Sequence, residues 1–522
     1  MRRSRMEKVV IMGILLMAWL VLGWTGESRA EVLLRVAIAA GDAGQLDPYF
    51  TAGMPDKALL QWIFDGLVRF KPGSMDPRTI EPDLAERWTS SPDGKIWTFQ
   101  LRKGVQFHRD YGELTAEDVV FSLQRAMNPK TSAYSNDFAE VKSIEAVNPY
   151  TVKITLNNPV PFLLGLVCNY QTGMIKSKKA VEKLGDKSMT NPIGTGPFMF
   201  EEYKAKQYVS CVAHKQYFRG APKIDRIIYR YIPSTSSREL AFRNGEIDLF
   251  YGDRDQRWVE RMRGYKDTVV DVFAPGEHRD LHLNMTIKPF DDVRVRRAVA
   301  HAINRDEIVQ FLGKDVAEPS WSVVPNGYLG QAMEGIPKYD YNPEMAKALL
   351  KEAGYPGGFS TKVMITTLEA LLKPMQIIQE QLRKVGIQVE LEVLEHATWH
   401  AQIRQNLSAM VIYGAARVPV ADTNLTQFFH SQSIIGTPKA VTNFSHTRAA
   451  DKEIEDARTQ TDVKKQLELW KAAQQKLMTE CAAVPIFELK QVWGRRASLD
   501  YGHVLTGSLN LGPVITEKSY FK

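Results

Sequence analysis

Motifs for bond-making chemistry are missing from this sequence of 522 residues. No Gly-x-Ser-x-Gly element supports a hydrolase nucleophile. The segment Gly194 to Pro197 lacks the Gly-Lys-Ser/Thr of a phosphate-binding loop, and its proline removes a backbone donor, so we interpret it as a tight turn. The pairs His278/His282 and His396/His400 have the i, i+4 spacing of zinc ligands on a helix, but neither carries the glutamate of a zinc protease. We therefore expect no enzyme, no metal site and no cofactor.

Cysteine and clustered positive charge are also scarce. Cys168, Cys211 and Cys481 have no metal-ligand spacing, and two interpretations stay open: one disulfide with a free thiol, or three buried thiols that act as small apolar residues. Residues 1 to 30 hold five basic and two acidic residues, so the net charge of +7 falls to +4 for the remainder. Charges of both signs are interspersed there, which indicates solubility and argues against nucleic acid as a partner.

Only the N-terminus contains a long hydrophobic run. Four basic residues precede an uncharged apolar stretch from Val9 to Trp24, and Ser28-Arg29-Ala30 offers the small residues that a signal peptidase reads. A retained membrane anchor is the alternative, although sixteen residues fall short of the roughly 20 that a membrane span needs. No cysteine near this site supports a lipid anchor. We expect cleavage after Ala30 and a freely diffusing periplasmic protein.

Residues 80 to 128 combine several local signals that predict one compact unit. Ser91-Pro92-Asp93-Gly94 is a turn sequence, and the β-rich run from Ile96 to Leu101 follows it. Thr115 stands three residues before Asp118, as in a capping box, and apolar residues then recur at helical spacing until a proline. The segment therefore predicts a turn, a strand and a capped helix.

The C-terminal half predicts helices that lead into strands. Asn342 and Pro343 are typical of a helix start, and Gly354 is typical of its end. A second amphipathic helix is expected over Met375 to Lys384, and an alternating, half-buried strand over Ile387 to Val393 follows it. This order, in a chain long enough for two or three domains, indicates α/β layering.

The unit at residues 80 to 128 resembles the family 5 extracellular solute-binding proteins of ABC importers, which include dipeptide- and oligopeptide-binding proteins. The matching residues are Pro82, Leu84-Ala85-Glu86, Asp93-Gly94, Phe99 to Gly104, Phe107-His108 and Thr115 to Val119. The resemblance continues through Gly194 to Phe198, Tyr217 to Pro222, Gly245 to Asp248, Leu283-Asn284 and Val293 to Ala298. It covers nearly all of the chain after the leader.

The resemblance implies a two-lobed α/β fold with a hinge: the type II periplasmic binding protein fold in its large form, which has an inserted subdomain. One lobe is built from separate pieces of the chain, so the chain crosses between the lobes more than once. We place the signal peptide at 1–30, lobe I at 31–60, 191–277 and 490–522, the inserted subdomain at 61–190, and lobe II at 278–489.

The segment from Tyr413 to Asp422 is the expected ligand site. In peptide receptors of this family it typically reads Gly-Trp-x-x-Asp, and the aspartate holds the ammonium group of the peptide. Counting four residues from Gly414 leads to Val418, so the acidic anchor is missing. Arg417 stands beside the lost position, and arginine prefers a carboxylate, a phosphate or a ring face. We expect an anionic or polar ligand group near Arg417; the alternative is that Arg417 pairs with Asp422 or another carboxylate of the protein.

Four further residues are candidate ligand contacts. Trp399 lies where the family often places an aromatic wall, although a core tryptophan is equally compatible with the sequence. Asn284 and His282 share one face of an expected strand. Tyr49 lies on the first loop after the N-terminal strand.

These features predict a monomeric receptor that captures a peptide or peptide-like solute between two lobes and delivers it to an inner-membrane ABC permease with its ATPase subunits. One alternative is a receptor of the same fold for an opine, a glutathione-like compound, an oligosaccharide or a metal chelate. A secreted hydrolase is a more remote alternative, because it would need a nucleophile and a base in contact.

Overall fold

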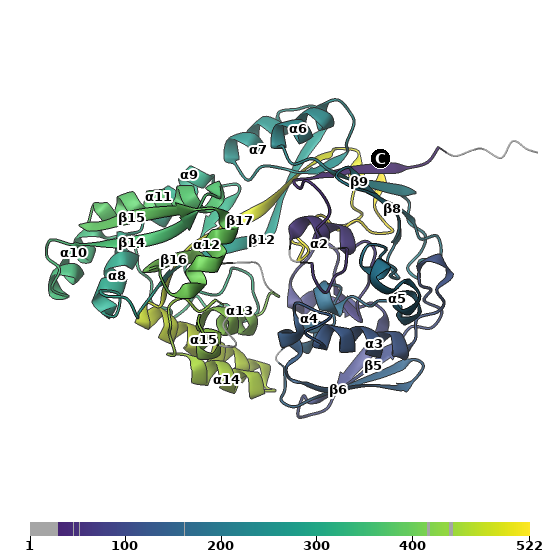
Figure 1. The fold of residues 1–522 in the computed structure, drawn as a ribbon, viewed down its shortest axis with the longest axis horizontal. Coiled ribbons are helices and arrows are strands. Elements are labelled where there is room, and N and C mark those ends of the chain that lie inside the picture. The colour runs from purple at the N-terminus through teal and green to yellow at the C-terminus, as the bar shows by residue number, and fades with distance from the viewer. Residues whose placement is uncertain (1–29, 45, 52, 161, 415–417, 438–441) are drawn as a thin grey trace, which may run out of the picture.

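Two long antiparallel strands, β12 (Thr268–Leu283) and β17 (Ala483–Arg496), run between the two lobes of the protein (Figure 1). The structure is a computed structural model that describes residues 30–44, 46–51, 53–160, 162–414, 418–437 and 442–522. Residues 1–29 of the expected signal peptide and Arg417 lie outside these residues.

Both strands belong to a nine-stranded mixed sheet. Its order is β16 (Met410–Tyr413), β12, β17, β11 (Leu249–Tyr251), β1 (Leu33–Ile38), β10 (Arg226–Tyr231), β9 (Tyr208–Ala213) and β8 (Phe198–Lys204), and β13 (Ala317–Pro319) pairs with β17. The strand β1 is parallel to both of its neighbours, β10 and β11. It is fully buried from Val36 to Ile38, as its apolar sequence requires.

The partners of β12 and β17 change along their length. The first part of β12, to Phe273, pairs with the end of β17, which is flanked there by β11. The ladder is interrupted between Phe273 and Glu277, and the rest of β12 then lies between β16 and the first part of β17. One strand pair therefore contributes to both lobes, on either side of an irregularity that locally weakens the ladder.

The inserted part of the first lobe has its own sheet and core. Its four antiparallel strands run in the order β4 (Ala85–Ser90), β5 (Ile96–Leu101), β7 (Thr151–Leu156) and β6 (Val141–Asn148), packed against α3 (Ala116–Met127). Thr115 and Asp118 form the expected capping box at the start of α3. The hairpin β2 (Val68–Phe70) and β3 (Ile80–Pro82) and the helices α4 (Leu163–Leu166) and α5 (Lys178–Leu184) complete this part. The strand and capped helix expected here are confirmed.

The second lobe is mainly helical around a parallel strand pair, β14 (Phe359–Thr366) and β15 (Ile387–Leu394). Its helices are α8 (Val293–Ala302), α9 (Arg305–Leu312), α10 (Pro343–Glu352), α11 (Glu369–Arg383), α12 (His396–Gln402), α13 (Ala421–Phe429), α14 (Asp451–Thr459) and α15 (Val463–Glu480). Asn342 caps α10 as expected, by accepting a hydrogen bond from the backbone N–H of Met345. The helix expected from Met375 begins earlier, at Glu369, and includes Pro374.

The remaining elements of the first lobe are α2 (Met54–Leu60), α6 (Thr235–Arg243), α7 (Gln256–Arg263) and the short pair β18 (Leu499–Asp500) and β19 (Tyr520–Phe521). Cys168, Cys211 and Cys481 are free thiols with 0% exposure. Across the described part of the chain, no helix combines the length and the apolar character that a membrane crossing requires.

Candidate functional site

The inserted part of the first lobe approaches the second lobe at Val418 and at Thr461. Val418 lies close to Gly165 of α4, because a Cβ on that glycine would come within 2.9 Å of Cγ1 of Val418. Thr461 lies close to Gly94, because a Cβ on that glycine would come within 3.4 Å of Cγ2 of Thr461. Figure 1 shows α4 and α13, which begins three residues after Val418, facing each other across the region between the lobes. The lobes are thus in direct contact on the side away from β12 and β17.

Near the strand pair, two arginines converge on one glutamate. Arg254, which follows β11, places Nη1 3.2 Å from Oε1 of Glu277. Arg279 donates from Nη2 to the other oxygen of Glu277 and from Nη1 to the carbonyl oxygen of Gly414. Burial alone would raise the pKa of Glu277, but the charges of the two guanidinium groups lower it overall. Glu277 is therefore held as a carboxylate.

The opposite face of β12 carries a second charged cluster. Nε2 of His278 lies 2.9 Å from Oδ1 of Asp280, and Nδ1 lies 3.4 Å from Oε1 of Glu488. Burial opposes protonation of this imidazole, but the two carboxylates outweigh burial and raise the pKa of His278 to about 10. Glu488 also accepts a 2.6 Å hydrogen bond from the backbone N–H of Asn326. This imidazolium links β12 to β17 and to the loop after β13.

Trp399 and Tyr413 are brought together by α12 and β16. Their rings are stacked with centroids 6.0 Å apart, and Tyr413 is partly exposed whereas Trp399 is only 1% exposed. Nε1 of Trp399 donates to the carbonyl oxygen of Met364 at 3.1 Å. The tryptophan therefore supports the tyrosine ring from the interior of the lobe. Its contact with a ligand stays a prediction.

His282 and Asn284 are also buried in the second lobe. The His282 ring lies among Phe428, Phe429 and Phe444, and neither of its nitrogens has a hydrogen-bond partner among the described residues. Burial lowers the pKa of His282 to about 4, so the ring is neutral. Asn284 donates from Nδ2 to Oδ1 of Asn406 at 2.7 Å and to the carbonyl oxygen of Ser408 at 3.1 Å. His278 and His282 both lie on the strand β12, so their i, i+4 spacing does not occur on a helix.

The remaining expected residues do not gather around one point. Tyr49 is buried in the core of the inserted part, and its hydroxyl group donates to the carbonyl oxygen of Met174 at 2.9 Å. Asp422 lies on α13 and forms an ion pair with Arg458 at 3.1 Å. The cationic partner of Asp422 among the described residues is therefore Arg458. Direct contact of these side chains with a ligand is not tested by the structure.

The match to a known family agrees with this architecture. Residues 79–435 match the model of the bacterial extracellular solute-binding proteins, family 5. The chain belongs to this family. A solved structure of MoaA from A. tumefaciens R10 in complex with mannopinic acid is 44% identical, covers 94% of this chain and 100% of that chain, and has a TM-score of 0.83.

Two further relatives are described with other ligands, a peptide and glutathione. DppA from Helicobacter pylori, solved with the peptide STSA, is 30% identical with a TM-score of 0.78 and covers 94% of this chain and 98% of its own. The glutathione-binding protein GsiB of Salmonella choleraesuis is 30% identical over 467 residues, 88% of this chain and 89% of its own. The two-lobed fold and the function as an ABC solute-binding receptor, both expected from the sequence, are thereby confirmed.

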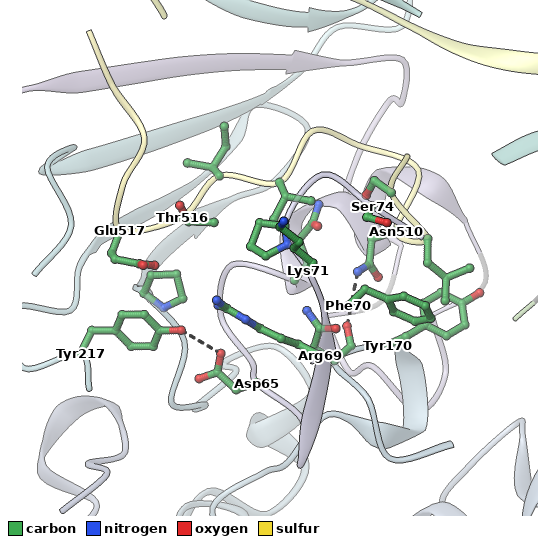
Figure 2. Close-up of a pocket in the computed structure, with 18 residues that line it drawn as sticks. Asp65, Arg69, Phe70, Lys71, Ser74, Tyr170, Tyr217, Asn510, Thr516 and Glu517 are labelled. Atoms are coloured by element: carbon green, nitrogen blue, oxygen red, sulfur yellow. Dashed lines mark hydrogen bonds between the residues drawn. The ribbon is translucent and has the colours of Figure 1, made fainter. Parts of the chain in front are cut away.

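The first lobe also has a small, partly open pocket of about 40 Å³ (Figure 2). Asp65 lies on its wall, where burial and the charge of Asp83 raise the pKa of Asp65 to about 7. Ser508 Oγ, Asn510 Oδ1 and Glu517 Oε2 line the same pocket without hydrogen-bond partners among the described residues. The space suits a few water molecules and is far smaller than the few hundred Å³ of a solute pocket. None of the residues expected from the sequence lines it.

The sequence reasoning missed Arg254, Glu277 and Arg279. A signal was present for Glu277 and Arg279, because Glu277 to Asp280 is a run of ionisable residues within a strand that ends at Leu283. No comparable signal marks Arg254. A metal site was not expected, and no group of three or more potential metal ligands exists among the described residues.

Proposed function

We propose that this receptor captures an acidic, non-peptide solute of the opine class between its lobes and delivers it to an inner-membrane ABC permease. One observation carries the choice of ligand: where peptide receptors of the family typically have an aspartate, this chain has Val418, which packs against the first lobe beside Phe162 and Gly165. The 44% identity to the protein solved with mannopinic acid supports the same class.

The physical argument concerns the ammonium group of a peptide. A charged amine that leaves water needs a carboxylate or several acceptors, and an unpaired buried charge costs several kcal/mol. Val418 offers neither, and its surroundings are apolar. A ligand that does not place an ammonium group at this position avoids this cost.

A peptide-like solute is the second candidate. It is favoured by the peptide in the DppA complex and by the glutathione named for GsiB, each at 30% identity. Backbone hydrogen bonds could hold such a ligand without an acidic anchor at Val418.

Calorimetric titration with mannopinic acid, glutathione and the peptide STSA separates these candidates. We expect measurable affinity for mannopinic acid and at least tenfold weaker binding of the peptide. Mass spectrometry of solute extracted from the purified protein provides an independent answer. A recovered dipeptide, or preferential binding of STSA, would contradict the opine proposal and support the second candidate.

Arg417 is proposed as a contact of the polar or anionic end of the ligand, from its sequence position beside Val418. The substitution Arg417→Ala should weaken binding of mannopinic acid, whereas Arg404→Ala on the surface of the same lobe should not. Equal affinity of Arg417→Ala and the wild type would remove Arg417 from the site.

We infer a periplasmic, monomeric protein that is cleaved after Ala30. The intact mass of the secreted protein tests the cleavage, and light scattering tests the monomer.

The lobe boundaries at 277/278 and 489/490 are proposals supported by the change of strand partners next to Glu277 and Leu489. Small-angle scattering tests the hinge: the radius of gyration should fall when ligand is added, and an unchanged value speaks against closure.

A further inference from the structure

We propose that Arg254 and Arg279 form an anion-binding subsite that holds a carboxylate of the solute, beside Glu277. The inference rests on the proposed capture of an acidic solute and assigns the side chains that recognise its charge. The two guanidinium groups approach Glu277 from different parts of the fold, Arg254 from the loop after β11 and Arg279 from β12.

The position of Arg254 is that of a ligand-binding residue in a parallel sheet. The strands β1 and β11 are parallel, and Arg254 lies three residues after the carboxyl end of β11. Ligands of open α/β sheets bind outside the carboxyl ends of such strands. Arg254 therefore faces the region in which a solute is expected on the side of the first lobe.

Arg279 lies on the other side of the irregularity in β12. It is anchored to the carbonyl oxygen of Gly414, the residue after β16, and therefore belongs to the second lobe. The partly exposed ring of Tyr413 lies next to this anchor. A carboxylate that accepts hydrogen bonds from Arg254 and Arg279 would bridge the two lobes and stabilise their closed arrangement.

Among these three side chains, two arginines face one carboxylate, which leaves one positive charge, and arginine cannot release its proton. The His278 cluster on the opposite face of β12 carries one more carboxylate than cation. An anionic guest is therefore recognised by the N–H groups of the two arginines and not by an overall positive charge of the strand.

One donor is also left over. Nη1 of Arg254 is buried and makes no hydrogen bond among the described residues, since its approach to Glu277 has the distance of an ion pair without hydrogen-bond geometry. A buried donor whose only acceptor is poorly aligned is incompletely satisfied, and a second carboxylate would complete its hydrogen bonding. Arginine donors also match a carboxylate in geometry.

Titration of the wild type and Arg254→Gln with mannopinic acid is the first test. We expect the affinity of Arg254→Gln to fall about ten- to a hundredfold, the range of a lost charge-assisted hydrogen bond. Arg261→Gln is the matched control, because Arg261 lies nearby on α7 but pairs with Glu239 at the surface. An unchanged affinity of Arg254→Gln, with binding by the wild type, overturns the subsite and leaves the proposed function intact.

A second test does not depend on the identity of the solute. Glu277→Ala removes the carboxylate of the protein and should create a site for acetate. We expect acetate to raise the melting temperature of Glu277→Ala more than chloride does at equal ionic strength. The wild type, in which Glu277 occupies part of the arginine donors, should show a smaller difference, and the double variant Arg254→Gln/Glu277→Ala should show none. If acetate and chloride have the same effect on Glu277→Ala, the subsite is overturned. If acetate stabilises Glu277→Ala but the wild type does not bind mannopinic acid, the opine proposal fails and the subsite stands.

Discussion

Val418 of the second lobe lies against Gly165 of the first, so close that a Cβ on this glycine would come within 2.9 Å of Cγ1 of Val418. The phenyl ring of Phe162 lies beside the same glycine and also packs against the cores of both lobes. The position at which we expect the amine anchor of peptide receptors is therefore part of an apolar contact between the lobes. We propose that this residue affects both ligand choice and lobe closure.

The substitution Val418→Asp should weaken closure. A carboxylate placed in this apolar contact loses hydration without gaining a partner, which costs about 1 to 3 kcal/mol on protein mutational scales. We expect about tenfold or greater loss of affinity for mannopinic acid in calorimetry, and a larger radius of gyration for the ligand-saturated variant.

Val504→Asp is the control for this substitution, because Val504 is 80% exposed. It should leave affinity and closure unchanged. Retained affinity for mannopinic acid in Val418→Asp would mean that the contact does not contribute to binding. A gain of dipeptide affinity in Val418→Asp would show that the missing anchor alone decides between the ligand classes.

Trp399 should contribute mainly to stability. Its side chain is almost fully buried and donates a hydrogen bond to Met364, so Trp399→Ala should lower the free energy of unfolding by about 3 to 5 kcal/mol. Urea denaturation measures this loss. Loss of ligand affinity in Trp399→Phe without any loss of stability would instead identify the indole ring as a wall of the ligand site.

His278 should make stability depend on alkaline pH. Its pKa in the folded protein is about 10, above the ordinary value of about 6.5, because Asp280 and Glu488 hold its proton. The stability it contributes is fully present below about pH 6.5 and is lost as the pH rises through about 10. One such group changes the free energy of unfolding by at most about 1.4 kcal/mol per pH unit.

Denaturation of the wild type and His278→Gln between pH 7 and 10 checks this dependence. The variant should be less stable at pH 7, and its stability should change less with pH. His301→Gln, on α8, keeps the His278 cluster and should follow the wild type. Parallel curves for His278→Gln and the wild type would mean that His278 is not protonated in the folded protein.

The cysteines should be unreactive in the native protein. All three are buried, and burial raises the pKa of Cys168 and Cys481 to about 12. We expect no reaction with Ellman's reagent at pH 8 in native conditions, and three reactive thiols in denaturant. Fewer than three under denaturing, non-reducing conditions would indicate a disulfide and contradict the structure.

Local structure was predictable because short-range signals specify it. The turn at Ser91 to Gly94, the strand from Ile96 and the capping box of Thr115 need only neighbouring residues, and all three occur. The start of α11 was missed: the helix was expected from Met375, but it begins at Glu369 and includes Pro374 in its second turn.

The candidate site was predictable only in part. The sequence predicted a site around Gly414 and the loss of the acidic anchor from a local motif, and both stay predictions. It could not identify Arg254 and Arg279 as neighbours, because they lie 25 positions apart and meet through the pairing of β11, β17 and β12. Nor could it distinguish the partly exposed Tyr413 from the buried Trp399 beneath it.

The sequence by itself determined the family and the α/β class, since both depend on residue types in a fixed local order. Only the tertiary structure decided which side chains meet: Val418 with Gly165 between the lobes, the two arginines on Glu277, and His278 between two carboxylates. The reason is physical: long-range contacts depend on how the strands pair and how the lobes pack, and no short stretch of sequence specifies either.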